Sequence, residues 1–149
     1  MTLSDKITKW IKDYAKEHKI KTLVVGISGG IDSAVVSTLC AKTGLPVYAV
    51  SMPIAQLSEQ HDLSIAHGEW LTNKFMNVEH LIVDLDKTYD RFYLDMLHID
   101  MDNELALANT KSRLRMVTLH HISGANRGIV VGTGNKVEDF GVGFYTKYG

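Results

Sequence analysis

The chain has 149 residues, of which 45% are hydrophobic and 22% are charged, which is the balance of one ordinary globular domain. The formal net charge of -1 excludes a broadly basic surface, so nucleic acid is not expected as a partner. The single cysteine, Cys40, excludes an internal disulfide framework. No apolar run is long enough for a membrane span or a signal-peptide core, so we expect a cytoplasmic protein with no membrane partner.

The first predicted element is an amphipathic helix. Ser4 and Asp5 are residue types that favour a helix start. Apolar residues then recur at helical spacing, at Ile7, Trp10, Ile11, Tyr14 and Ala15. We expect this face to pack against a sheet or against another subunit.

Strands and helices alternate along the rest of the chain. Short apolar runs predict strands at residues 22–27, 46–51, 78–83 and 128–132. Helical patterns separate them at residues 33–43, 58–75, 86–97 and 103–124. This alternation predicts an α/β fold of three layers, in which a parallel sheet has helices on both faces, as one domain over residues 1–149.

Ligands of such sheets bind beyond the carboxyl ends of the strands. The segments expected at that edge are residues 28–33, 51–57, 84–86 and 133–138. The topology therefore predicts that these separate segments form one site.

The first of these segments is a glycine turn between a strand and a helix. Its sequence is Ser28-Gly29-Gly30-Ile31-Asp32-Ser33. Glycines let backbone N–H groups converge on phosphate oxygens, and the helix N-terminus adds partial positive charge. Asp32 is suited to hold a magnesium ion beside the phosphates. The alternative is a tight turn that Ser28 or Ser33 caps.

This turn resembles the SGGxDS loop of the ATP pyrophosphatases, which cleave ATP between its α and β phosphates. The resemblance implies the adenine nucleotide α-hydrolase-like fold, in which this PP-loop holds pyrophosphate. The same loop occurs in NAD synthetases, GMP synthetases and tRNA-modifying enzymes, so it indicates a chemistry and leaves the substrate open.

A second glycine-rich run follows the last predicted strand. It begins with Gly132-Thr133-Gly134-Asn135, passes Glu138 and ends with Gly143-Phe144-Tyr145-Thr146-Lys147-Tyr148-Gly149. Glycine at this density is typical of a loop that approaches a ligand closely, although a flexible terminal loop has the same composition. A carboxylate in this run is suited to face Asp32 and complete a magnesium site.

These residues are similar to the signature of the NAD synthetase family, in which GTGN-x-x-E leads to a Thr-Lys-Tyr-Gly run. The preceding helix adds a third match, because Asn109-Thr110-Lys111-Ser112-Arg113-Leu114-Arg115-Met116 resembles that family's Asn-x-x-x-Arg-x-Arg-Met. The segment between Glu138 and Gly143 is one residue longer than the commoner family pattern, which affects the placement of Lys147.

The resemblance implies a set of site residues. It assigns ATP binding to Gly26, Ile27, Ser28, Gly29, Gly30, Ile31, Asp32, Ser33 and Thr133. The implied magnesium ligands are Asp32 and Glu138, and the implied contacts to deamido-NAD are Arg113 and Lys147. No residue is assigned as a covalent nucleophile.

Helical geometry distinguishes the two arginines of the third motif. Residues two apart lie about 200° apart around a helix axis, so Arg113 and Arg115 cannot enter the same pocket. Asn109 and Arg113 share a face, which favours Arg113 as the substrate contact. We expect Arg115 to have a surface position or a structural ion pair.

The implied reaction is the amidation of deamido-NAD to NAD. The substrate carboxylate attacks the α-phosphorus of ATP, Mg²⁺-bound pyrophosphate leaves, and ammonia displaces AMP from the acyl-adenylate. The resemblance also implies a homodimer, with free ammonia or a separate glutaminase as the nitrogen source. The family continues beyond the position of Gly149, so we expect an N-terminal portion with weak or absent turnover.

Two other functions are compatible with part of the pattern. Another PP-loop ATP pyrophosphatase, GMP synthetase-like or tRNA-modifying, shares the first loop and lacks the runs around Glu138 and Lys147. A nucleotide-binding module would bind ATP without releasing pyrophosphate.

Overall fold

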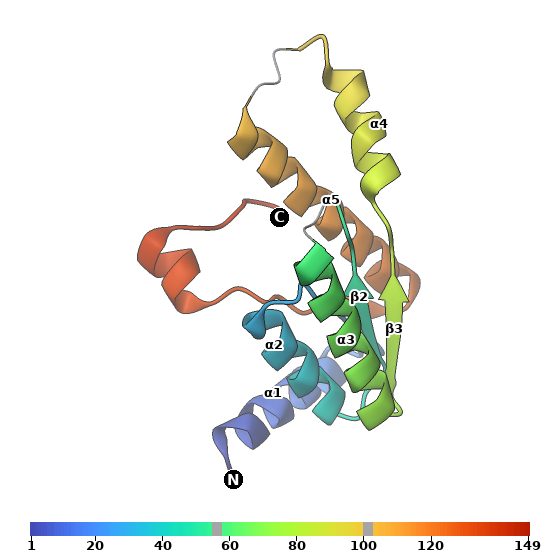
Figure 1. Cartoon of the computed structure of the whole chain (residues 1–149). Coiled ribbons are helices and arrows are strands. Elements are labelled where there is room, and N and C mark those ends of the chain that lie inside the picture. Colours follow the sequence, from blue (N-terminus) through green and yellow to red (C-terminus); the bar gives the residue numbers. More distant parts are fainter. Residues whose placement is uncertain (55–57, 100–102) are drawn as a thin grey trace.

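The computed structural model describes residues 1–54, 58–99 and 103–149. Its elements in chain order are α1 (Leu3–Glu17), β1 (Thr22–Gly26), α2 (Ile31–Lys42), β2 (Val47–Ser51), α3 (Ser58–Lys74), β3 (Val78–Ile82), α4 (Asp86–Met96), α5 (Glu104–Ala125), β4 (Gly128–Val130) and the π-helix η1 (Val137–Val142). The strands form one parallel sheet in the order β3-β2-β1-β4. The predicted three-layer fold is confirmed (Figure 1).

The predicted elements agree with the observed ones apart from shifts at their ends. The main correction concerns α2, which begins at Ile31, so the second half of the glycine turn already belongs to the helix. The helix α1 begins at Leu3 and is capped by Thr2, whose hydroxyl accepts from the Asp5 N–H while the Asp5 carboxylate accepts from the Thr2 N–H. Residues 55–57 of the predicted segment 51–57 lie outside the described residues.

Alternate residues of the central strand point to opposite faces of the sheet. Leu23 and Val25 belong to a core shared with α1, α2 and α3, whereas Val24 belongs to a second core shared with α5. Of the two partners expected for α1, the folded domain is observed, because Ile11 and Ala15 lie in the first core, while other residues of the predicted face, such as Trp10, stay exposed. The sheet is therefore buried on both faces, as its continuous apolar strands predict.

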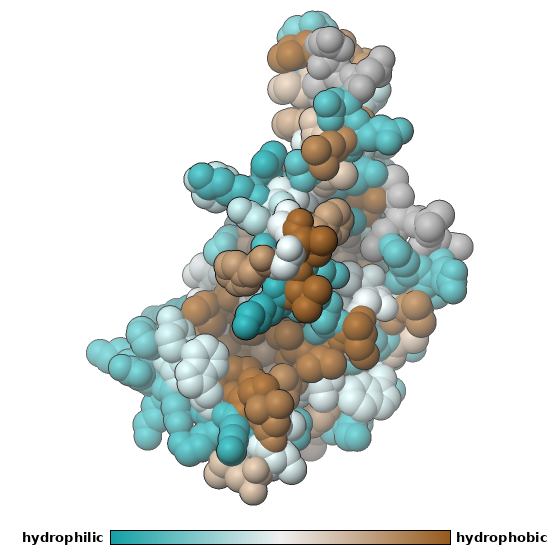
Figure 2. Space-filling view, turned by 90° about the vertical axis from the view of Figure 1, so that its left-hand side faces the viewer, coloured by the Kyte–Doolittle hydropathy of each residue, from teal (hydrophilic) through white to brown (hydrophobic). Residues whose placement is uncertain are grey.

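Two helices, α4 and α5, extend beyond the sheet (Figure 1). The helix α4 follows β3 and rises past the carboxyl ends of the strands, together with the first half of α5 (Figure 1). None of the residues of α4 is buried. Hydrophobic residues also gather in the middle of the face that Figure 2 shows, between hydrophilic regions. No helix in the described part of the chain combines the length and the apolar character that crossing a bilayer requires.

Two histidine–serine pairs lie around α3, one between α3 and α2 and the other between β3 and β2. His67 Nε2 lies 2.8 Å from Ser37 Oγ, and His80 Nε2 lies 2.8 Å from Ser51 Oγ. Burial lowers the pKa of both imidazoles below the ordinary value of about 6.5. The neighbouring His80 lowers the pKa of His67 further, whereas Glu69 opposes the shift at His80.

The lowered pKa values of His67 and His80 predict that the protein loses stability in acid. A lowered pKa in the folded state means that the unfolded chain binds more protons, so stability is full above about pH 6.5 and falls as the pH drops toward the folded-state values. Thermal unfolding between pH 7.5 and 5 should therefore show a falling midpoint. The double variant His67→Gln/His80→Gln, which does not titrate there, should have a shallower dependence. An equal slope in both proteins would contradict this assignment.

Candidate functional site

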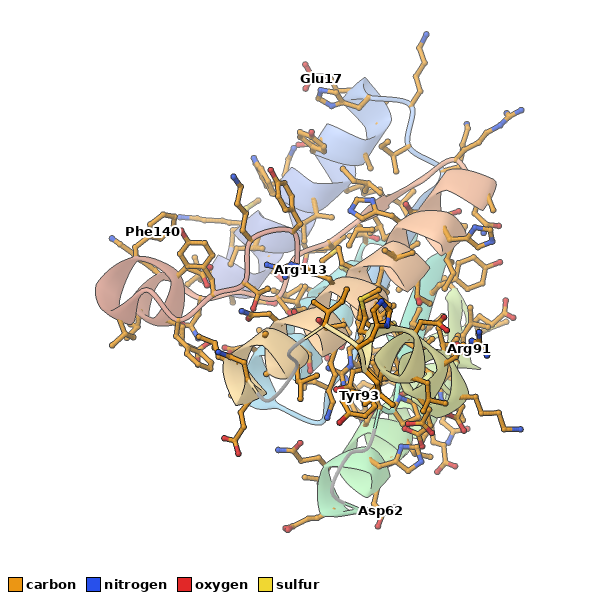
Figure 3. The ribbon with its side chains drawn as sticks, turned by 90° about the horizontal axis from the view of Figure 1, so that it is seen from above. Glu17, Asp62, Arg91, Tyr93, Arg113 and Phe140 are labelled. Atoms are coloured by element: carbon orange, nitrogen blue, oxygen red, sulfur yellow. The ribbon has the colours of Figure 1, made fainter. Side chains whose placement is uncertain are left out.

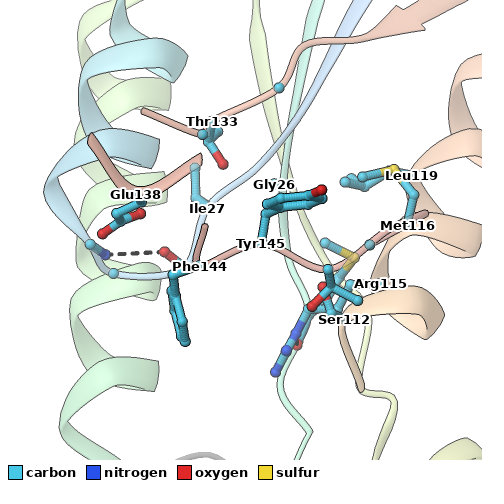
Figure 4. A pocket seen from close by; sticks show the side chains of 18 of the residues that line it. Gly26, Ile27, Ser112, Arg115, Met116, Leu119, Thr133, Glu138, Phe144 and Tyr145 are labelled. Carbon is cyan, nitrogen blue, oxygen red and sulfur yellow. Dashed lines mark hydrogen bonds between the residues drawn. The ribbon is translucent and has the colours of Figure 1, made fainter. Parts of the chain in front are cut away.

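A cavity of about 1510 Å³ opens at the carboxyl ends of the strands. Its wall combines the glycine turn, the start of α3, one face of α5 and the C-terminal segment. The lining residues include Gly26, Ile27, Ser28, Gly29, Gly30, Met52, Glu59, Leu63, Ser112, Arg115, Met116, Leu119, Thr133, Glu138, Asp139, Phe144 and Tyr145. Figure 4 shows Thr133 and Glu138 on one side, the α5 side chains on the other, and Tyr145 between them. Of the four segments predicted to form one site, 28–33, 51–57 and 133–138 contribute lining residues, whereas 84–86 does not, because Leu85 is buried in the second core.

The glycine turn is shaped for an anion. Gly30 is the N-cap of α2, and no side chain caps this helix. The alternative of a turn that Ser28 or Ser33 caps is confirmed in part, because both hydroxyls bind the backbone of the turn itself. Ser28 Oγ accepts from the Gly30 N–H at 3.2 Å, and Ser33 Oγ accepts from the Ser28 N–H at 3.2 Å and donates to the Gly30 carbonyl at 2.9 Å. The uncapped amino end of a helix at a cavity is a binding site for phosphate-like groups.

Gly29 is required by both its conformation and its surroundings. Its φ of 89° lies in the left-handed region, and a Cβ there would lie 2.6 Å from the Gln60 carbonyl oxygen. The turn is thus pressed against the backbone of α3. Only glycine lets the chain pass this close.

The side chain of Asn135 joins the two predicted metal-binding segments. Its Nδ2 donates to Asp32 Oδ2 at 3.1 Å, and its Oδ1 accepts from the Glu138 N–H at 2.9 Å. One amide therefore connects the first turn of α2 to the first turn of η1. Glu138 lines the cavity, whereas Asp32 is not among its lining residues.

The C-terminal run is structured by a π-helix. The chain winds as η1 from Val137 to Val142, and Gly143, with φ 69°, is the C-cap of this helix. The Phe144 N–H donates to the Glu138 carbonyl at 2.7 Å, which fixes the chain where it turns back toward α5. The additional residue before Gly143 falls within the wider π winding.

Arg113, near the middle of α5, contacts the backbone of Lys147. Arg113 Nε donates to the Lys147 carbonyl at 3.1 Å, and Thr146 Oγ1 donates to Asn109 Oδ1 at 2.7 Å. Figure 3 shows Arg113 beside the C-terminal segment and Phe140 on η1 at the outer edge. The prediction that Asn109 and Arg113 share a helix face is confirmed. Both side chains of the predicted dinucleotide contacts are exposed and lie outside the cavity lining.

The expectation for Arg115 is wrong. Its side chain is half-buried, lines the cavity, and donates from Nε to the Met52 carbonyl at 3.0 Å. Burial lowers the pKa of the guanidinium, which stays charged. Arg115 thus places a cation on the α5 side of the cavity, opposite Glu138. The face of α5 that meets the sheet could not be identified from the spacing of two arginines.

Several lining residues were not predicted. Ser112, Arg115, Met116 and Leu119 repeat at three- and four-residue spacing along α5, which marks a single helix face. Met52 follows β2 directly, as expected for a residue at the ligand-binding edge. Within the described ranges, no three His, Cys, Asp or Glu side chains come together as a metal site. Two carboxylates remain sufficient for Mg²⁺, which keeps water and phosphate ligands.

Comparison with known proteins gives a consistent result. The family model described as NAD synthase matches residues 3–149. The chain is 32% identical over 148 residues to the NH(3)-dependent NAD(+) synthetase of Carboxydothermus hydrogenoformans, covering 98% of this chain and 59% of that protein. The relative of the same name from Finegoldia magna is 36% identical over 149 residues, with 99% and 58% covered. The chain thus spans less than two thirds of the length of these relatives.

Solved structures agree on the fold. The NMN synthetase of Francisella tularensis superposes with a TM-score of 0.88 at 31% identity, over 98% of this chain and 58% of that one. The NH3-dependent NAD synthetase of Campylobacter jejuni, in complex with a nitrate ion, gives a TM-score of 0.83 at 30% identity, over 98% and 61%.

The two glycines of the turn should differ in their tolerance of alanine. Gly29→Ala combines a strained backbone with a collision with α3, so we expect it to lower the free energy of unfolding by about 2 kcal/mol or more. Gly30→Ala, whose Cβ would meet only the Ser28 hydroxyl at 3.3 Å, should cost clearly less. Urea unfolding of both variants measures the difference, and equal losses would contradict this geometry.

Proposed function

The chain belongs to the NAD synthase family, and from this premise we propose that it takes part in the ATP-dependent amidation of deamido-NAD to NAD, with ammonia as nitrogen donor. The observation that supports this most strongly is the junction between the glycine turn and the run around Thr133. Two loops from distant parts of the sequence meet at one cavity, and each carries a carboxylate. That arrangement suits a nucleotide triphosphate with its cation.

We assign the binding of ATP to the glycine turn. Residues 26–30 line the cavity, and the amino end of α2 follows at residues 31–33, so this segment would supply partial positive charge to the phosphate groups. Thr133 lines the same cavity and would contact the nucleotide from the opposite loop.

The residues present fit a Mg²⁺ ion. Asn135 brings the segments of Asp32 and Glu138 together, and neither carboxylate forms an ion pair within the described residues. Asp32 and Glu138 would hold the ion with water and phosphate oxygens. When bound, the ion would neutralise charge on the phosphates of ATP and on the departing pyrophosphate.

The chemistry requires alignment and charge stabilisation more than a nucleophile from the protein. The carboxylate of deamido-NAD attacks the α-phosphorus of ATP, and the bond to the pyrophosphate breaks. Ammonia then attacks the carbonyl carbon of the acyl-adenylate, AMP leaves, and the amide nitrogen loses a proton to water. The glycine turn would hold the leaving pyrophosphate. Its N–H groups would stabilise the negative charge that develops on this group and so lower the barrier to its departure relative to water.

The anionic dinucleotide needs cations. Arg113 of α5 donates to the Lys147 carbonyl, and we propose that both residues contact deamido-NAD. Arg115 adds a cation inside the cavity. We further propose a cytoplasmic homodimer in which α5 lies at the interface, because Leu105 and Val117 leave apolar surface exposed along this helix. A separate glutaminase is a possible ammonia source.

One observation favours a second candidate substrate. The structural relative from Francisella tularensis is named an NMN synthetase, so the amidated nucleotide can also be nicotinic acid mononucleotide. The reaction at the carboxylate and the role of the glycine turn would be the same. Only the contacts to the adenylyl half of the substrate would differ.

A panel of substrates tests the proposal. Pyrophosphate release is measured with ATP, Mg²⁺ and ammonia, together with deamido-NAD, nicotinic acid mononucleotide, xanthosine monophosphate or tRNA. Release with deamido-NAD supports the proposal, and release with the mononucleotide alone supports the second candidate. Release with xanthosine monophosphate or tRNA assigns the chain to another ATP pyrophosphatase. Binding of ATP without release in any arm indicates a nucleotide-binding module.

The two carboxylates should be essential. Asp32→Ala and Glu138→Ala each remove one proposed magnesium ligand, so we expect pyrophosphate release to fall at least about 100-fold. Asp62→Ala, which removes an exposed carboxylate of α3 outside the cavity lining, serves as the matched control and should keep normal activity. Near-normal release by either of the first two variants would refute the metal assignment.

A further inference from the structure

A buried chain of hydrogen bonds lies behind the glycine turn. Ser64 Oγ donates to the Ile27 carbonyl at 2.8 Å, Ser51 Oγ lies 2.6 Å from Ser64 Oγ, and His80 Nε2 lies 2.8 Å from Ser51 Oγ. Ser51 and Ser64 are only 1% and 2% exposed. This series of hydrogen bonds therefore connects β3, through β2 and α3, to Ile27, the last residue before Ser28.

The direction of this chain follows from what each atom can donate. The Ile27 carbonyl can only accept, so the single hydroxyl proton of Ser64 points toward it. Ser51 must then donate its own proton to Ser64 Oγ, which leaves His80 Nε2 as the donor to Ser51. His80 is thereby fixed with its proton on Nε2.

The end of the chain fixes one peptide unit of the turn. The carbonyl of the Ile27–Ser28 peptide accepts from Ser64, and its N–H donates to Ser33 Oγ at 3.2 Å. The next amide, of Gly29, follows directly from the plane of this peptide. Its orientation decides whether its N–H points toward a phosphate group in the cavity.

The histidine ring is held in place by the close packing of α3. A Cβ on Gly68 would collide with the ring of His80, so glycine at this position makes room for the imidazole beside Ser51. The ring is half-buried between the helix and the sheet. The series of hydrogen bonds is therefore fixed at one end by the packing of the His80 ring and at the other by the Ile27 carbonyl.

We propose that Ser64, Ser51 and His80 are positioning residues that keep the glycine turn in its phosphate-binding conformation. The proposal deepens the proposed function and rests on the assignment of that turn to the phosphates of ATP. Ser64 acts on the turn directly, and Ser51 and His80 act through Ser64. None of these side chains lines the cavity.

The protein contains a matched control pair. Ser37 is fully buried and accepts from His67 Nε2, while its own hydroxyl donates to the Ala34 carbonyl inside α2 at 3.1 Å. This pair has the same chemistry and comparable burial, and the hydrogen bonds of Ser37 Oγ go to Ala34 and His67, outside the glycine turn. Ser37→Ala therefore shows how the loss of a buried serine hydroxyl changes stability and ligand affinity when the hydrogen bond to the glycine turn is kept.

The first test uses the isolated protein without any ligand. The ¹⁵N chemical shifts of His80 at pH 7.5 should identify the Nε2–H tautomer, and the Nδ1–H tautomer would overturn the proposal. Amide hydrogen exchange at Ser28 should accelerate at least about fivefold in Ser64→Ala, because one buried hydrogen bond is lost, and should be unchanged in Ser37→Ala. Unchanged exchange in Ser64→Ala would also overturn the proposal.

The second test separates positioning from general stability by the choice of ligand. Ser64→Ala and His80→Leu should bind ATP and pyrophosphate roughly tenfold more weakly, with AMP affinity unchanged, because AMP lacks the phosphates that the turn would hold. His80→Gln keeps an N–H donor near the position of Nε2 and should restore most of the affinity. Equal weakening for all three ligands, or no recovery with glutamine, would overturn the proposal.

The two proposals fail in different ways. If the wild-type chain binds neither ATP nor pyrophosphate, the proposed function is wrong, and the positioning proposal, which presupposes phosphate binding at this turn, falls with it. If the wild type binds both and Ser64→Ala binds both equally well, only the positioning proposal is wrong. Variant Gly68→Ala gives an independent check, because it should displace the His80 ring without removing any polar group and should weaken pyrophosphate binding in the same way.

Discussion

The site depends on the two hydrogen bonds of the Asn135 side chain. This single amide accepts from the Glu138 N–H and donates to Asp32, a residue 103 positions earlier in the sequence. It thereby couples the amino end of α2 to the amino end of η1 at the edge of the sheet. Each of these two ends carries a carboxylate, and the nucleotide chemistry proposed for this protein needs both segments at the same edge. Without this coupling, the glycine turn would still favour an anion but would have no partner loop.

The glycine turn is itself held from behind. Gly29 presses against the α3 backbone, and Ser64 holds the Ile27 carbonyl, so the turn is shaped by a helix that is remote in sequence. Buried hydrogen bonds of this kind contribute modest net stability, but an unpaired member costs more, so they favour one backbone conformation. A preorganised turn does not have to reorder when phosphate binds. This is the physical reason to connect the buried serines with the function of the cavity.

The conformation of the C-terminal run depends both on its local sequence and on its packing against α5. The additional residue before Gly143 is accommodated by π winding, which leaves Thr146 and Lys147 in contact with Asn109 and Arg113 of α5. The two arginines of that helix take different surroundings, as their spacing requires. Arg113 holds the C-terminal backbone, whereas Arg115 braces the Met52 carbonyl and faces the cavity. The chain thus presents cations on two sides of the same helix.

The order of the strands and helices, the parallel sheet and the glycine turn could be derived from the sequence, because they follow from the alternation of apolar runs and from backbone freedom at residues such as Gly29. The same holds for the shared face of Asn109 and Arg113, which is a property of any helix. The inward direction of Arg115, the bridge through Asn135 and the support of Ile27 by Ser64 were decided only by the tertiary structure. Each depends on how a helix is rotated against the sheet or on which distant loops meet, and the residue spacing within one segment does not contain that information.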